Sequence, residues 1–187
     1  MRGNLLGSSI AAVFGLVYVA VNTGPLPAPV AWPLRALALL AFLAVAVAVA
    51  RRRGRDDASG ASAGGVLGLG RAYWTVVLVE ALALFGGVRV LSGPLGRPEA
   101  GVAWVSLVVG VHFFALAVVF GQPSFHLLGA AVTACGAVGM VLALSGAPVG
   151  LVDLVAGVLP GALLLAAAWW GAHREPGAGV EGRASSA

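Results

Sequence analysis

Lysine is absent from this 187-residue chain, cysteine occurs once, and charged residues make up only 10% of the sequence. A soluble domain carries roughly a quarter charged residues, so this scarcity argues against an ordinary soluble fold. The single Cys135 lies in an apolar run, which excludes a disulfide framework and a thiolate metal site. The chain has no glycine-rich phosphate loop, nucleophile elbow or HExxH motif, so most soluble enzyme chemistries are excluded as well.

What remains is the composition of a membrane protein, with 60% hydrophobic residues. Its apolar segments reach about 25–35 Å as helices at ~1.5 Å per residue, which is enough to cross the hydrocarbon core of a bilayer. Connections rich in proline and glycine separate these segments. We expect six transmembrane helices, at residues 5–21, 34–50, 73–91, 101–120, 125–144 and 149–170. The sequence therefore predicts an all-α membrane bundle over residues 1–172 and a disordered tail over residues 173–187.

The arginines indicate how the bundle is oriented. The connection over residues 51–71 holds five arginines, whereas the connection before it holds none and the one after it holds only Arg97. Because positive loops stay in the cytoplasm, we expect a multi-pass protein of the cell membrane with cytoplasmic termini and a cytoplasmic loop 51–71. The first span follows Arg2 as a signal peptide would, but its core is long and no small-x-small motif closes it. We therefore expect this span to be retained.

The net charge of +4 does not indicate nucleic acid. The excess charge is concentrated at Arg51, Arg52, Arg53 and Arg55, directly beside an apolar helix, and is not spread over a face with interleaved aromatics. We therefore expect lipid headgroups as the partner of these arginines.

Glu80 and His112 are expected to face each other inside the hydrocarbon region. Each lies seven or eight residues from the cytoplasmic end of its predicted span, which puts both about 12 Å deep. An ionisable side chain in hydrocarbon costs about 2.5–3.5 kcal/mol, so such groups usually face the bundle interior and are paired. The pair is either a structural hydrogen bond between two helices or a site that handles a proton or a ligand.

Arg89 and Asp153 lie toward the outer end and are expected to form a second polar pair, with Arg35 and Glu99 as competing partners. Glu80 and Arg89 are nine residues apart, which places them on opposite faces of one helix. The third span is therefore a central helix, or else Arg89 snorkels outward.

His126 begins the fifth predicted span near the cytoplasmic surface, where we expect an interfacial histidine. Two span histidines, one glutamate and a distant cysteine do not have the spacing of metal ligands. The sequence therefore predicts no metal and no other cofactor.

Small residues indicate where helices approach closely, because lipid offers no hydrophobic drive for association. Gly129, Thr133 and Gly136 form one stripe of the fifth span, which we therefore place in the bundle centre.

The last span carries a small-xxx-small pair, Gly157 and Gly161, with Pro160 between them. Pro160 is expected to kink this helix and to free the carbonyl of Ala156, because proline lacks the N–H that this carbonyl would bind.

Residues 101–140 resemble a segment of small, uncharacterised multi-helix membrane proteins of G+C-rich bacteria. The resemblance covers two of the six predicted spans and implies a compact helical membrane protein, but it implies no function. Its recognisable parts are His112-Phe113-Phe114, Leu116-Ala117, Phe125-His126 and Gly129.

Three functions remain open at this point. The first is a binding or transport bundle, proton-coupled or for a small molecule, with its site at Glu80 and His112. The second is a membrane-embedded enzyme that acts on an apolar lipid or isoprenoid substrate, with Glu80 as general acid. The third is an accessory protein without a pocket, which binds another membrane protein or a second copy of itself through its glycine-rich helices.

Overall fold

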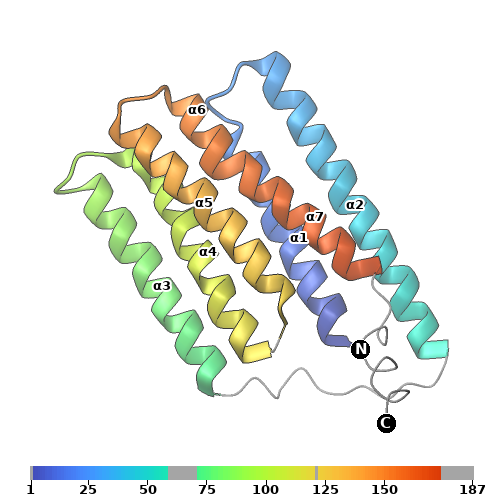
Figure 1. Cartoon of the computed structure of the whole chain (residues 1–187). Coiled ribbons are helices and arrows are strands. Elements are labelled where there is room, and N and C mark those ends of the chain that lie inside the picture. Colours follow the sequence, from blue (N-terminus) through green and yellow to red (C-terminus); the bar gives the residue numbers. More distant parts are fainter. Residues whose placement is uncertain (1, 59–70, 121, 174–187) are drawn as a thin grey trace, which may run out of the picture.

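The computed structural model describes residues 2–58, 71–120 and 122–173, and all of its regular structure in these ranges is helical (Figure 1). The long helices are α1 (Arg2–Asn22), α2 (Ala28–Ala58), α3 (Arg71–Ser92), α4 (Gly101–Phe120), α5 (Ser124–Leu144) and α7 (Leu159–His173). A short 3-10 helix, η2 (Pro98–Ala100), precedes α4. Helix α6 (Val149–Asp153) continues through the π-helix η3 (Leu154–Val158) into α7 as one rod.

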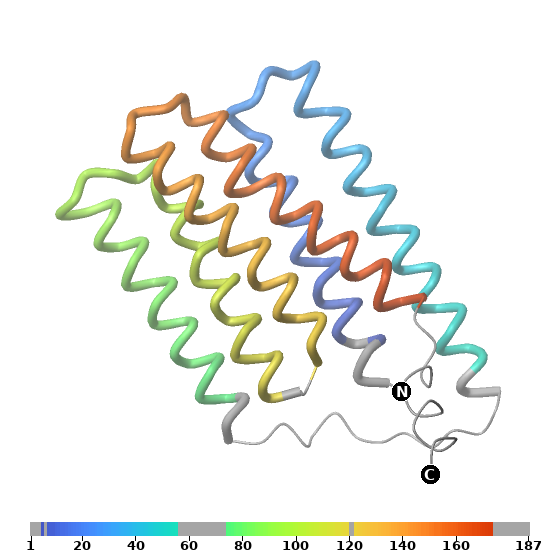
Figure 2. The backbone as a smooth tube through the Cα atoms, viewed as in Figure 1, coloured from blue at the N-terminus to red at the C-terminus, as the bar shows by residue number. Residues whose placement is uncertain are grey.

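The rods lie side by side and alternate in direction along the chain (Figure 1, Figure 2). Helix α3 forms one edge of the bundle and packs on α4. Helix α4 in turn packs along α5. At the other side, α1 packs against α7, and α2 covers both of them. Small side chains such as Ala12, Val45 and Ala168 are buried in this second group of helices.

Within the described residues, five helical stretches are long and apolar enough to cross a membrane, which confirms the predicted all-helical class and supports a membrane protein. The five stretches are Ala28–Arg55, Trp74–Ser92, Pro98–Val119, Ser124–Leu144 and Val149–His173. The apolar stretch of α1, Gly7–Asn22, is shorter than these. Helix α1 nevertheless lies inside the bundle, because its Ala12 and Val19 are buried against α2 and α7.

Helix α2 is longer than the sequence predicts at both ends. It begins at Ala28, since Pro29 and Pro33 fall in its first turns, where a missing N–H disturbs few helical hydrogen bonds. It continues through the arginines to Ala58, because arginine is a good helix former. The predicted loop 51–71 therefore begins as a helix and ends in one. The remainder of that loop, 59–70, and the tail 174–187 lie outside the described residues.

Helices α4 and α5 approach closely along the stripe of small residues that the sequence indicates. A Cβ atom added to Gly129 would lie 2.9 Å from the Gly110 carbonyl oxygen, and one added to Gly136 would lie 3.0 Å from that of Ala103. Thr133 lies between these two glycines and packs directly on Gly110. Because α5 also contacts η3 and α7, it joins the two halves of the bundle.

Candidate functional site

Glu80 of α3 and His112 of α4 meet between the two helices. The distance from Oε2 of Glu80 to Nδ1 of His112 is 3.0 Å, and the side chains are 20% and 12% exposed, respectively. The separation suits a hydrogen bond, but the alignment does not, so this is a close polar contact without hydrogen-bond geometry. Glu80 lies nine residues after the start of α3 and His112 eight before the end of α4, so both are ~12–14 Å from the arginine-rich end.

Trp104, eight residues before His112 on α4, fixes the position of α3 on α4. Its Nε1 donates a hydrogen bond of 2.9 Å to the carbonyl oxygen of Ala83. Its indole ring occupies the space above Gly87, where a Cβ atom would overlap the ring. The lack of a side chain at Gly87 therefore lets α3 approach, and this contact holds Glu80 opposite His112.

A second group of polar atoms lies deeper in the bundle, where α1, α4 and η3 meet. Ser106 is fully buried, and its hydroxyl donates a short hydrogen bond to the carbonyl oxygen of Ala156. The buried hydroxyl of Tyr18 lies near Ser106 and within electrostatic reach of Glu80. Among the described residues it has no partner with hydrogen-bond geometry. Tyr18 and Ser106 therefore form a second polar group, which is separate from the Glu80–His112 contact.

The π-helix η3 lies where the sequence predicts a kink. Pro160 has no N–H to offer the carbonyl of Ala156, and Ser106 donates to this carbonyl from the neighbouring helix. Gly157 is needed in η3 because Asn22 of α1 occupies the space that a Cβ would take. In the same way, a Cβ on Gly161 would lie 2.9 Å from the carbonyl oxygen of Gly15. The two glycines therefore bring α1 against this rod.

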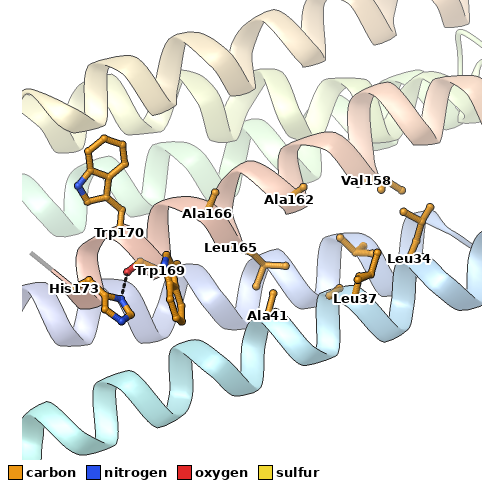
Figure 3. A pocket seen from close by; sticks show the side chains of 12 residues that line it. Leu34, Leu37, Ala41, Val158, Ala162, Leu165, Ala166, Trp169, Trp170 and His173 are labelled. Carbon is orange, nitrogen blue, oxygen red and sulfur yellow. Dashed lines mark hydrogen bonds between the residues drawn. The ribbon is translucent and has the colours of Figure 1, made fainter.

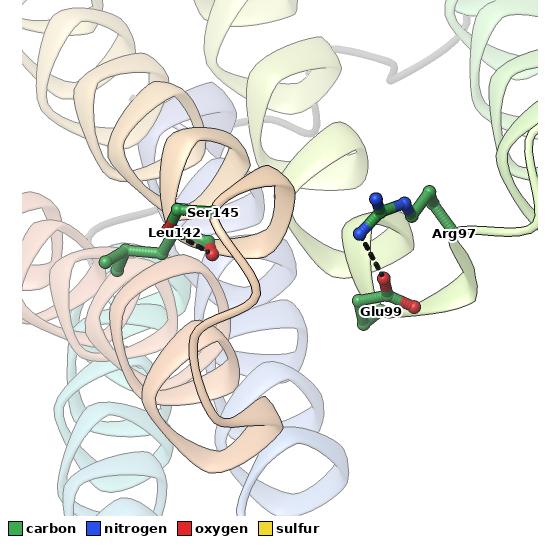
Figure 4. A network of polar contacts seen from close by, with 4 residues as sticks. All are labelled: Arg97, Glu99, Leu142 and Ser145. Atoms are coloured by element: carbon green, nitrogen blue, oxygen red, sulfur yellow. Dashed lines mark hydrogen bonds and ion pairs between the residues drawn. The ribbon is translucent and has the colours of Figure 1, made fainter.

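The expected pair of Arg89 and Asp153 does not form: among the described side chains, no ion pair joins these two. Helix α3 is an edge helix that packs on α4, and Arg89 is exposed on it. Asp153 instead lines a small cavity of about 380 Å³ together with Glu99. Nη1 of Arg97 lies 3.6 Å from Oε1 of Glu99 (Figure 4). The hydroxyl of Ser145 donates a hydrogen bond of 2.9 Å to the carbonyl oxygen of Leu142.

His126 is exposed near the start of α5, and its ring centroid lies 5.9 Å from that of Phe114. Among the described side chains, no hydrogen bond or ion pair joins it to Glu80 or His112. Within the described ranges, no three His, Cys, Asp or Glu side chains gather as metal ligands would.

The apolar sequence pattern does not reveal Tyr18, Ser106 or the link between Arg35 and Thr23. Nε of Arg35 donates a hydrogen bond of 2.7 Å to the hydroxyl of the buried Thr23. The one feature of the sequence that could indicate these residues is the presence of hydroxyl groups within or beside apolar spans. Such groups are common in membrane helices, and only the rotation of each helix decides which of them face each other.

No protein-family model, curated protein sequence or solved structure matches this chain.

Proposed function

We propose that this chain is a six-span, proton-coupled transport protein of the cell membrane, in which Glu80 and His112 take up and release the proton. The 3.0 Å contact between a carboxylate and an imidazole inside two helices of membrane-spanning length is the observation that carries the proposal. Such a pair can hold one proton between two groups, and intramembrane ionisable groups commonly mark ion pathways.

The polar atoms deeper in the bundle support a route for the proton. The hydroxyl of Tyr18 lies near Ser106 and within electrostatic reach of Glu80, and Asn22 follows one turn later on the same helix. Tyr18, Ser106 and Asn22 therefore extend the set of polar groups from Glu80 toward the end of the bundle opposite the arginines of α2. The π-helix beside them adds support, because single π turns in helices often accompany functional sites.

The proposed topology has α1 as the sixth crossing, with both termini and the arginine-rich end of α2 in the cytoplasm. The alternating directions of the rods are compatible with this topology (Figure 1). The excess of arginine at one end of the bundle supports the direction of insertion.

An enzyme with Glu80 as general acid receives less support. The large apolar groove of this protein lies between α2 and α7, whereas Glu80 lies on α3 at the opposite edge of the bundle. An apolar substrate in that groove would not reach the carboxyl group.

Proton uptake by reconstituted vesicles tests the proposal. Vesicles loaded with a pH-sensitive dye are exposed to an acid step, and the wild-type protein is expected to acidify their interior faster than protein-free vesicles do. Glu80→Gln is expected to reduce this rate to that of protein-free vesicles, because the amide cannot exchange a proton.

Glu99→Gln is the matched control, since it makes the same carboxyl-to-amide change at a side chain that contacts Arg97 and leaves Glu80 and His112 in place. It is expected to retain the wild-type rate. If Glu80→Gln acidifies vesicles as fast as the wild type, or if Glu99→Gln is equally inactive, Glu80 is not the proton site and its contact with His112 is structural.

A further inference from the structure

A long apolar groove runs between α2 and α7, on the opposite side of the bundle from Glu80. It has a volume of about 930 Å³, and Val19 of α1 also lines it. Leu37 and Ala41 face it from α2, and Ala162 and Leu165 face it from α7 (Figure 3). Its walls are almost entirely aliphatic, so a ligand along its length must itself be apolar.

The shape of the groove suits a hydrocarbon chain. On α7 and the end of η3, its lining extends from Val158 to His173, which is ~22 Å at ~1.5 Å per residue. This is most of the ~30 Å thickness of a hydrocarbon core. Both helices that border the groove contain stretches long and apolar enough to cross a membrane, so in a bilayer its open side would face lipid.

One end of the groove is polar and aromatic. Trp169, Trp170 and His173 gather there (Figure 3). The ring centroids of Trp169 and His173 lie 4.0 Å apart. Nη2 of Arg52 donates a hydrogen bond of 2.6 Å to the carbonyl oxygen of His173. Arg52 therefore bridges α2 and α7 at this end, beside tryptophans of the kind that occupy the headgroup level of a bilayer.

The charge at this end is positive. Arg51, Arg53 and Arg55 lie exposed on the same segment of α2 as Arg52. Even with Asp56 and Asp57 counted, residues 51–57 hold four arginines against two aspartates. Basic residues beside a membrane helix attract anionic lipid headgroups.

We propose that the groove between α2 and α7 is a binding site for an anionic phospholipid. One acyl chain lies along the aliphatic walls, and the phosphate lies at Arg52 and the neighbouring arginines. The inference is independent of the proposed function, because it concerns other helices and needs no proton exchange at Glu80.

Native mass spectrometry of the protein released from bilayers of equal parts phosphatidylglycerol and phosphatidylcholine tests this site. The wild-type protein is expected to carry one phosphatidylglycerol in preference to phosphatidylcholine. Arg52→Gln is expected to reduce this preference about fivefold, the weight of one arginine near an anionic surface.

Ala162→Phe is the second variant, because the phenyl ring enters the groove from an exposed position on α7 and leaves every charge in place. It is expected to abolish the bound lipid. Ala46→Phe, at an exposed position of α2 outside the groove lining, and Arg97→Gln, at the other end of the bundle, are the matched controls and should retain the lipid.

Equal retention of the two lipids by the wild type would overturn the proposal, as would unchanged lipid in Ala162→Phe. If Ala162→Phe instead converts a dimer into a monomer without changing the bound lipid, the groove is covered by a second copy of this chain and the lipid site is wrong.

Discussion

Ser106 and Pro160 act on the same backbone carbonyl, that of Ala156. Pro160 withholds the N–H that a regular helix would supply four residues later, and Ser106 donates its hydroxyl proton to the oxygen. In hydrocarbon a backbone carbonyl without a donor is costly, so the two residues depend on each other. Their interaction joins α4 to η3 directly beside the Tyr18 hydroxyl.

A double-mutant cycle measures this dependence. Ser106→Ala alone is expected to lower the free energy of unfolding by about 1 kcal/mol, the usual contribution of one hydrogen bond. In a Pro160→Ala background the same change should cost less, because the new N–H at residue 160 can bind the carbonyl of Ala156. Unfolding in mixed detergent micelles gives both values, and an equal loss in the two backgrounds would contradict the account.

The depths of Glu80 and His112 could be predicted because a helix rises by a fixed ~1.5 Å per residue, so counting from the ends of two spans gives both levels. The rotation of a helix about its own axis is harder to obtain from an apolar sequence, where few polar residues mark a face. For that reason the contact of Glu80 with His112 was predicted, whereas the position of Tyr18 was not. The same uncertainty explains why Arg89 was paired with Asp153, although α3 turns out to be an edge helix.

The packing of helix α4 against helix α5 depends on glycines. Gly136 faces the backbone of Ala103 and Leu107 so closely that a methyl group has no room. Gly86 on α3 is also helical but has nothing within 4 Å of where its Cβ would be. The stripe of small residues correctly indicates the face of α5 that packs closely, since close packing in lipid needs such residues, but it does not indicate that α4 is the partner.

Gly136→Ala is therefore expected to lower the free energy of unfolding by about 1–3 kcal/mol, as overpacking does. Gly86→Ala should leave it unchanged or raise it by up to about 1 kcal/mol, because alanine is the better helix former. Thermal unfolding of the two variants in the same detergent compares them. A loss of the same size in both would mean that helix propensity, not packing, governs the effect.

The whole molecule divides into an edge with the polar pair and an edge with the apolar groove. Helices α3 and α4 carry Glu80 and His112, helices α2 and α7 form the groove, and α1 and α5 lie between them (Figure 1). The apolar composition and the proline- and glycine-rich connections were enough to predict the class and most helix bounds. They do not predict that α2 extends through its arginines, because charge ends an apolar span whereas arginine does not end a helix.

Cysteine labelling tests the proposed topology of the whole molecule. In a Cys135→Ala background, Arg53→Cys and Arg97→Cys place single thiols at opposite ends of the bundle, both at exposed positions. A membrane-impermeant thiol reagent is expected to label intact cells only through residue 97. Residue 53 should react only after the membrane is opened, and labelling of residue 53 in intact cells would contradict a cytoplasmic arginine-rich end.

The most direct test of the central claim, that Glu80 and His112 exchange a proton inside the bundle, is pH-difference infrared spectroscopy of the reconstituted protein. The account predicts a carboxyl band that appears on acidification, is absent in Glu80→Gln and has a changed midpoint pH in His112→Gln. Identical difference spectra for the wild type and Glu80→Gln would show that Glu80 does not exchange a proton, and would contradict the account.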